Sequence, residues 1–148
     1  MSLRDIVLAM QCICIIGVFA ESVVIVKRWK NELHLYLLLS SIALLLNEIG
    51  TLLELTAETG GELIAALKFA YFGRVWYVFF LFLFVAELTR VKVPKVLKNI
   101  LILIHMATYG VILTIPHNGL YYTNIEIQTG GMFLRVVHGN GIAHHILM

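Results

Sequence analysis

The strongest candidates for chemistry in this sequence are three ionisable side chains that lie inside long apolar runs: Glu48, Lys68 and Arg74. A charged residue at the middle of a membrane helix costs roughly 2.5 to 3.5 kcal/mol on insertion scales, so such residues usually face a partner or a cavity. The sequence leaves two interpretations open. The three residues could form a buried ion pair that fixes the register of two helices. Alternatively, they could line an outward-open polar pocket whose ligand or proton changes that pairing.

Neutral polar residues accompany these charges. Asn47 and Thr51 lie close to Glu48 in the chain and can donate hydrogen bonds between helices, each worth about 0.6 kcal/mol in measured membrane proteins. Tyr71 belongs to an aromatic-rich run in the third apolar stretch. The candidate ligand-binding or sensing residues are therefore Glu48, Lys68, Arg74, Asn47 and Tyr71.

The other reactive side chains predict neither a metal centre nor an active site. Cys12 and Cys14 point in different directions on a helix and are expected to be small buried hydrophobic residues. His105 is expected to be a hydrogen-bonded packing residue. The sequence holds no nucleophile–base constellation and no phosphate-binding loop, so we expect no metal, no cofactor and no enzymatic activity in this chain. The histidines near its end match no metal-binding spacing: His138, His144 and His145.

The elements that must hold these residues are membrane helices. Of the 148 residues, 60% are hydrophobic and only 14% are charged, whereas a soluble domain carries roughly 25% charged residues. A membrane-spanning helix needs about 20 mostly apolar residues. Four stretches qualify, at about 6–26, 33–55, 63–88 and 96–115. The net charge of +2 comes from residues that flank these stretches, so no nucleic-acid partner is expected.

The pattern changes after the fourth stretch. Residues at about 121–138 alternate between polar and β-branched or aromatic side chains on either side of Gly130-Gly131, which predicts a small external β-hairpin. Residues 141–148 begin another apolar run and stop before they could cross a bilayer. We therefore expect an all-α membrane protein: a polytopic helical bundle with four complete transmembrane helices, the hairpin and a partial fifth helix. This single membrane-embedded domain, 1–148, is expected to be a fragment of a longer protein.

Basic residues predict the orientation of the helices. Lys and Arg next to membrane spans are retained on the cytoplasmic side, and Trp anchors spans at the headgroup level. Two such clusters are separated by two apolar stretches, which places the N-terminus outside. The anchors are Lys27, Arg28, Trp29 and Lys30 after the first stretch, and Arg90, Lys92, Lys95 and Lys98 after the third.

This orientation predicts the depth of the candidate residues. At a rise of about 1.5 Å per residue, Glu48 lies about 12 Å below the outer surface, with Lys68 at about 9 Å and Arg74 at about 18 Å. The carboxylate falls between the two cations. The three charges therefore predict one site in the outer part of the bundle.

Three segments carry a resemblance to a known family. Residues 66–73 read ALKFAYFG, residues 87–89 read ELT, and residues 113–123 read LTIPHNGLYYT. They resemble the N-terminal seven-helix membrane region of bacterial sensor histidine kinases and related diguanylate cyclases, which has a similar Tyr-Leu-Gly at its third helix and a Thr-Asn-Pro-x-His segment before an external hairpin. Where the family often has a His-His pair after the proline, this chain has His117 and Asn118.

The resemblance implies a membrane-embedded sensory input module of a bacterial signal-transduction protein, such as a two-component system. Such a module would lie in the bacterial cytoplasmic (inner) membrane as a homodimer. It would transmit a stimulus to a cytoplasmic kinase or cyclase domain in cis, which is absent from this chain. Two alternatives remain from the residues themselves: a fragment of a small-solute or ion transporter whose pathway is lined by Glu48, Lys68 and Arg74, and a free-standing four-helix scaffold.

Overall fold

Capping residues set where two of the helices begin. The computed structural model describes residues 2–28, 32–117, 119, 121–128 and 131–142. The Ser2 hydroxyl accepts a hydrogen bond from the Asp5 backbone N–H, and the Asp5 carboxylate accepts one from the Ser2 N–H, so α1 runs over Leu3–Lys27. Thr59 and Glu62 form the same reciprocal box before α3, Gly60–Leu88. Such boxes satisfy backbone donors that the first helical turn leaves free.

The two remaining helices are α2, Glu32–Thr56, and α4, Lys95–Leu113. All four are long and apolar enough to cross a membrane, which confirms the predicted all-α membrane fold. The helices extend beyond or stop short of the apolar stretches by a few residues. α3, for example, begins at Gly60 instead of residue 63, because its cap lies upstream of its first apolar residue.

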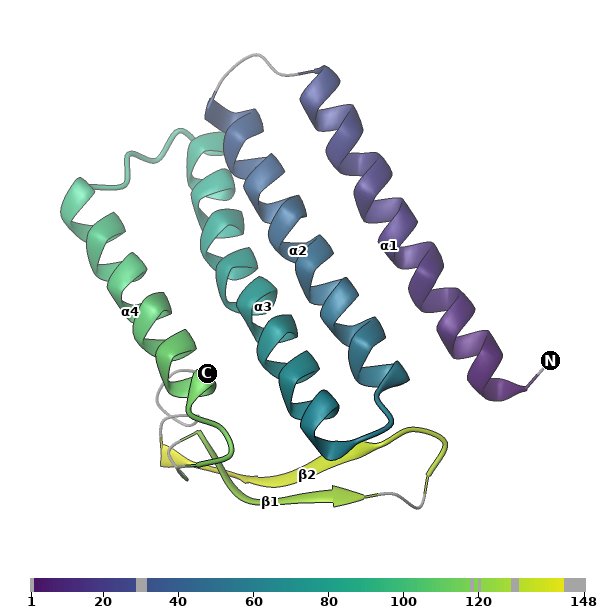
Figure 1. Cartoon of the computed structure of the whole chain (residues 1–148). Helices are drawn as coiled ribbons and strands as arrows, with labels where there is room; N and C mark the ends of the chain where they lie inside the picture. Colours follow the sequence, from purple (N-terminus) through teal and green to yellow (C-terminus); the bar gives the residue numbers. More distant parts are fainter. Residues whose placement is uncertain (1, 29–31, 118, 120, 129–130, 143–148) are drawn as a thin grey trace.

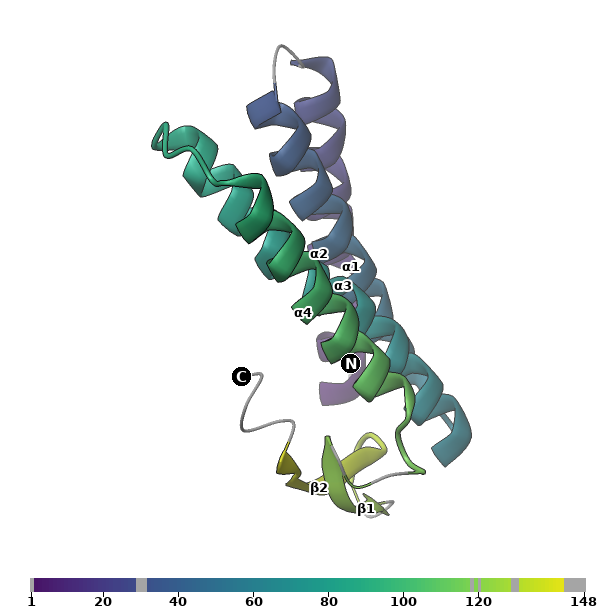
Figure 2. The same cartoon turned by 90° about the vertical axis from the view of Figure 1, so that its left-hand side faces the viewer.

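The helices form one curved row in the order α1, α2, α3, α4 (Figure 1). Figure 2 shows the same row from its α4 side, with α4 in front of α3 and α1 behind α2. The last turn of α1, the first turn of α2 and the α3–α4 loop lie at the same end of the helices, which we call the basic end of the row. The α2–α3 turn and the hairpin lie at the other, the hairpin end.

Glycines bring α2 and α3 into the closest contact of the row. A side chain at Gly50 would overlap Ala70, and one at Gly73 would overlap the backbone of Ala43 and Asn47. Small residues allow such close approach of helices in membranes, where dispersion contacts drive association. The α2–α3 pair is therefore the most tightly packed part of the row.

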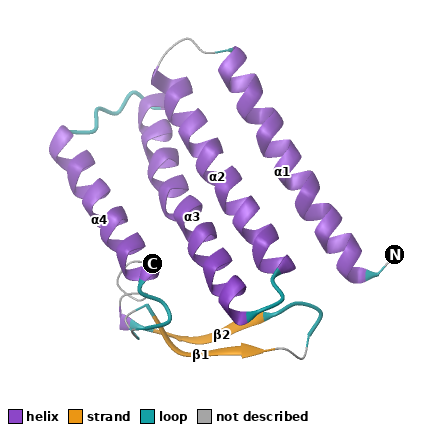
Figure 3. Cartoon of the chain, viewed as in Figure 1, coloured by secondary structure: helices purple, strands orange, loops and turns teal. Residues whose placement is uncertain are grey.

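The predicted hairpin is present. Strand β1, Tyr122–Gln128, pairs antiparallel with β2, Arg135–Asn140, and Tyr122 lies opposite Asn140 (Figure 3). Tyr121 and Tyr122 are buried with Ile112, Ile115 and residues of α3, so the ribbon rests on the helix ends. Gly130, at the predicted turn, and residues 143–148, in the predicted fifth helix, lie outside the described residues.

The expectation that Cys12 and Cys14 are buried was wrong, because both are exposed. α1 is an edge helix that packs against α2 on one side, and its other faces carry exposed apolar residues such as Ile13 and Ile16. Lipid chains are as apolar as a protein interior, so an apolar residue in a membrane span need not be buried within the protein.

Candidate functional site at the hairpin end

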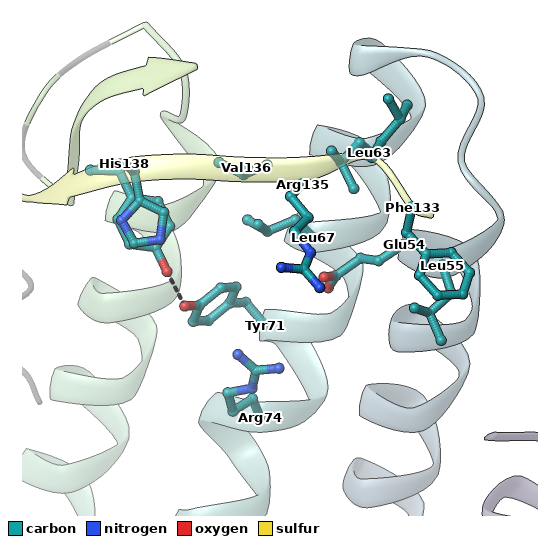
Figure 4. Close-up of a pocket in the computed structure, with 12 residues that line it drawn as sticks. Glu54, Leu55, Leu63, Leu67, Tyr71, Arg74, Phe133, Arg135, Val136 and His138 are labelled. Carbon is teal, nitrogen blue, oxygen red and sulfur yellow. Dashed lines mark hydrogen bonds between the residues drawn. The ribbon is translucent and has the colours of Figure 1, made fainter. Parts of the chain in front are cut away.

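A cavity of about 370 Å³ opens between the hairpin and the ends of α2 and α3. Figure 4 shows β2 lying across its top, with side chains of α2 and α3 pointing into it from below. Both polar and apolar residues line it: Glu54, Leu55, Leu63, Leu67, Tyr71, Arg74, Tyr122, Phe133, Leu134, Arg135, Val136 and His138.

One face of α3 supplies a third of this lining. Leu63, Leu67, Tyr71 and Arg74 follow one another at spacings of four, four and three residues, which places them in a stripe along one side of a helix. Their character changes with depth, from apolar at the hairpin to polar at Tyr71 and Arg74. The part of the wall that α3 supplies is therefore apolar near the hairpin and polar at the bottom of the cavity.

A cluster of tyrosines joins the helices to the hairpin. The hydroxyl groups of Tyr71 and Tyr122 are hydrogen-bonded, as the dashed line in Figure 4 marks. The Tyr71 and Tyr121 rings meet edge to face with centroids 5.7 Å apart, and Tyr122 stacks on His138 of β2 at 3.5 Å. Burial raises the pKa of both Tyr121 and Tyr122 above its ordinary value. The Tyr122 hydroxyl is therefore neutral at physiological pH and can donate a hydrogen bond.

Arg74 links Tyr71 of this cluster to α2. Its guanidinium lies 4.7 Å from the centre of the Tyr71 ring, within the range of a cation–π interaction. Its Nε donates a hydrogen bond of 3.2 Å to the Asn47 side-chain oxygen. Arg74 thus binds a ring on its own helix and an amide on the neighbouring helix while lining the cavity.

Glu48 faces α1 instead of α3. Its carboxylate accepts one hydrogen bond from the Gln11 amide at 2.7 Å and another from the Asn47 amide at 3.1 Å. Gln11 also donates to the Glu48 backbone carbonyl at 2.9 Å. The expected arrangement, with Glu48 between two cations, differs from the structure, because residues 47 and 48 project about 100° apart around the helix.

Lys68 takes no part in the cavity. It is half-buried on α3, one residue beyond Leu67 and so on a different face of the helix. Within the described ranges, the structure pairs Lys68 with neither Glu48 nor Arg74. Of the three residues, Arg74 lines the cavity, Glu48 turns toward Gln11, and Lys68 lies on another face of α3.

The structure instead joins Asn47, Glu48, Arg74 and Tyr71 in one polar chain. It runs from Gln11 on α1 through Glu48, Asn47 and Arg74 to Tyr71 on α3, and from there to Tyr122 and His138 of the hairpin. Every step is a hydrogen bond, a cation–π contact or a ring stack.

Two charged residues of the cavity were missed by sequence reasoning: Glu54 and Arg135. Their side chains point toward one another across the cavity in Figure 4. Glu54 lies two turns beyond Asn47 on α2, at i+7, and this spacing could have placed it on the face toward α3. Arg135 could not be placed, because nothing in the sequence states on which helix the hairpin rests.

The predicted anchors gather at the basic end. Lys27 and Arg28 lie at the end of α1, while Arg90, Lys92, Lys95 and Lys98 follow α3. Trp29 and Lys30, and also His144 and His145, lie outside the described residues. His105 is a packing residue as expected, because its Nδ1 lies 2.7 Å from the Leu101 carbonyl oxygen and its ring stacks on Trp76.

Comparison with known proteins adds one finding. Residues 7–148 match the family model of the N-terminal 7TM region of histidine kinase. No curated protein and no solved structure matches the chain. The match includes most of α1, the other three helices, the hairpin and every residue of the polar chain.

Proposed function

Because the chain belongs to the family of N-terminal 7TM regions of histidine kinases, we propose that its cavity at the hairpin end is the place where a stimulus is sensed. The family supports a sensory input module of a signalling protein. The module passes the change to a kinase or cyclase domain in cis on the cytoplasmic side. It lies in the bacterial inner membrane with its N-terminus outside, an orientation supported by the basic residues at the opposite end of the row.

The observation that carries this proposal is the polar chain from Gln11 to His138. It touches α1, α2, α3 and both strands, and Arg74 and Tyr71 belong to the chain and to the cavity wall. A ligand in the cavity that withdraws Arg74 from Asn47 removes a bond between α2 and α3 directly. The ligand then acts by its different affinity for two helix packings.

The charges of the cavity favour a small ligand with an anionic group. Arg74 and Arg135 give +2 and Glu54 gives −1, a formal sum of +1 with His138 neutral. Guanidinium groups bind carboxylate or phosphate oxygens through paired hydrogen bonds. The apolar part of the lining, near Leu63 and Leu67, suits a hydrocarbon portion of the same molecule.

Replacing Arg74 tests the proposal. In the full-length signalling protein, Arg74→Met removes the bond to Asn47 and one cavity cation while keeping an unbranched side chain. We expect the output at a given stimulus to change by about fivefold or more, the lower range of allosteric coupling. The measurement is kinase or cyclase activity in membrane vesicles as a function of stimulus.

Lys68→Met is the matched control. It removes a cation from the same helix at a half-buried position outside the cavity. Both variants must reach the membrane in equal amounts. Equal responses of the Arg74→Met and Lys68→Met proteins would refute a sensing role for this cavity.

A further inference from the structure

A second cavity, of about 450 Å³, lies at the basic end of the row, beside the connection from α3 to α4. It is separate from the proposed sensing site and shares no residue with it. Four cations, one carboxylate and several apolar residues line it: Tyr36, Leu83, Ala86, Glu87, Arg90, Val91, Lys92, Val93, Lys95 and Lys98.

The charge of this cavity is strongly one-sided. Arg90, Lys92, Lys95 and Lys98 contribute +4 and Glu87 contributes −1, so the formal sum is +3. Cations that only flank a span can project separately into water, whereas these four converge on one hollow. Their mutual repulsion decreases when an anion lies among them.

Lys98 is held in place within this group. Its Nζ donates a hydrogen bond of 3.3 Å to the Tyr36 hydroxyl and lies 5.5 Å from the centre of that ring. The ammonium group has three donors, so the bond to Tyr36 leaves two that can serve a ligand. The contact also connects α4 to α2 across the end of α3.

Arg90 adopts an unfavourable backbone conformation at the rim of the cavity. Its φ of 58° places it in the left-handed region, which glycine adopts more easily than any other residue. The turn that ends α3 is closed by bonds from the Arg90 N–H to Glu87 and from the Val91 N–H to Ala86. Glycine would satisfy the same turn without a penalty, so the turn itself does not require the guanidinium.

We propose that this cavity binds the headgroup of an anionic phospholipid. The cavity lies where α3 ends and α4 begins, at the level where a span meets the headgroups. The neighbouring residues of α4, Val96 and Leu97, are exposed, and Leu83, Val91 and Val93 give the cavity an apolar wall. A phosphodiester bound by Lys98 and Arg90 thus has an apolar surface beside it for its acyl chains. Basic pockets between membrane helices bind anionic headgroups in the same way.

The test measures lipid binding to the purified chain. The protein is reconstituted in phosphatidylcholine nanodiscs with or without phosphatidylglycerol, and bound lipid is counted by native mass spectrometry after mild release. We expect phosphatidylglycerol to be retained at least tenfold over phosphatidylcholine. We also expect Lys98→Gln and Lys95→Gln each to reduce this preference about fivefold or more.

Lys27→Gln is the control, because it removes a cation from the same end of the row without touching the cavity. It should leave the preference unchanged. Equal loss in the Lys27→Gln protein would show a general surface attraction and overturn the proposal. Displacement of phosphatidylglycerol by millimolar inorganic phosphate would also overturn it, since the cavity would then select the free anion. Lys95 is exposed, so its variant keeps the test valid if Lys98→Gln impairs folding.

Discussion

The most instructive residues are the neighbours Asn47 and Glu48. Asn47 accepts a hydrogen bond from Arg74 on α3, whereas Glu48 accepts one from Gln11 on α1. Their depths in the membrane, as expected from the sequence, are nearly equal, because they are neighbours along the helix. Their direction around the helix decides which partner each one meets, and the sequence alone does not fix that direction.

Gln11 illustrates the same limit. A single amide within an apolar run, as at residue 11 within residues 6–20, is a recognisable sign of an interhelical hydrogen bond. Lys68 is more conspicuous in the sequence because it is charged, yet the neutral Gln11 is the residue that binds Glu48. The nature of the polar site could thus be predicted from the sequence, but its partners could not.

Tyr122 gives a prediction at the scale of one residue. Replacing it by Phe removes the hydrogen bond to Tyr71 and keeps the ring that stacks on His138. We expect a loss of about 1 kcal/mol in the free energy of unfolding at neutral pH, the usual net worth of one hydrogen bond. Reversible unfolding in mixed detergent micelles, followed by circular dichroism, measures this loss.

The same variant should change how stability depends on alkaline pH. Burial raises the pKa of Tyr122 in the folded protein above the ordinary 10.0. Its contribution is therefore complete below pH 10 and is lost as the pH rises above it, because the unfolded state then releases the proton first. Tyr122→Phe should flatten this decline. Tyr109→Phe is the control, because it also keeps every lysine but removes a tyrosine hydroxyl at another place, where the ring packs on Phe72. Any decline in stability caused by the lysines is therefore the same in both variants. Equal slopes in both variants would contradict the assignment.

At the scale of elements, the contact between α2 and α3 depends on glycine more than on aromatic bulk. The aromatic residues of α3 were the conspicuous feature of the sequence, yet Gly50 and Gly73 mark where the two backbones meet. The four spans and the hairpin could be predicted because hydropathy and alternation are properties of single segments. The pairing of α2 with α3 through particular small residues is a property of two segments and could not.

Gly73→Ala should weaken this contact. The added methyl group would overlap the Ala43 carbonyl and the Asn47 backbone, and neither can move without shifting α2. We expect a destabilisation of about 1 to 3 kcal/mol, typical of overpacking, together with loss of the Arg74–Asn47 bond. Gly17→Ala is the matched control in α1, where a methyl group meets nothing within 4 Å. A stability for Gly73→Ala equal to that of Gly17→Ala would disprove the close contact.

At the scale of the whole molecule, the row of helices separates two chemically different ends. The hairpin end carries the tyrosine cluster and the cavity with Glu54, while the basic end carries Lys27, Arg28 and the cations of the α3–α4 connection. This division could be predicted from the basic residues alone. The two cavities could not, because each requires residues from three or more elements.

The proposed orientation is tested by labelling from one side of the membrane. In a background with Cys12→Ser and Cys14→Ser, Glu58→Cys lies in the exposed α2–α3 turn and Lys92→Cys in the exposed α3–α4 connection. A membrane-impermeant maleimide added to intact spheroplasts should label Glu58→Cys, and label Lys92→Cys only after permeabilisation. The reverse pattern would place the N-terminus inside and the cavity with Arg74 on the cytoplasmic face.

α3 forms a wall of both cavities. Tyr71 and Arg74 line one, and Leu83 and Glu87 line the other, on a single unbroken helix of 29 residues. Tyr71 and Leu83 are 12 residues apart, a rise of about 18 Å along the axis. If a ligand at one end displaces this helix, the displacement reaches the other cavity too. Thermodynamic linkage then makes the effect reciprocal. If the stimulus changes the affinity for the lipid by some factor, the lipid changes the affinity for the stimulus by the same factor, so the lipid composition of the membrane sets the threshold for the stimulus.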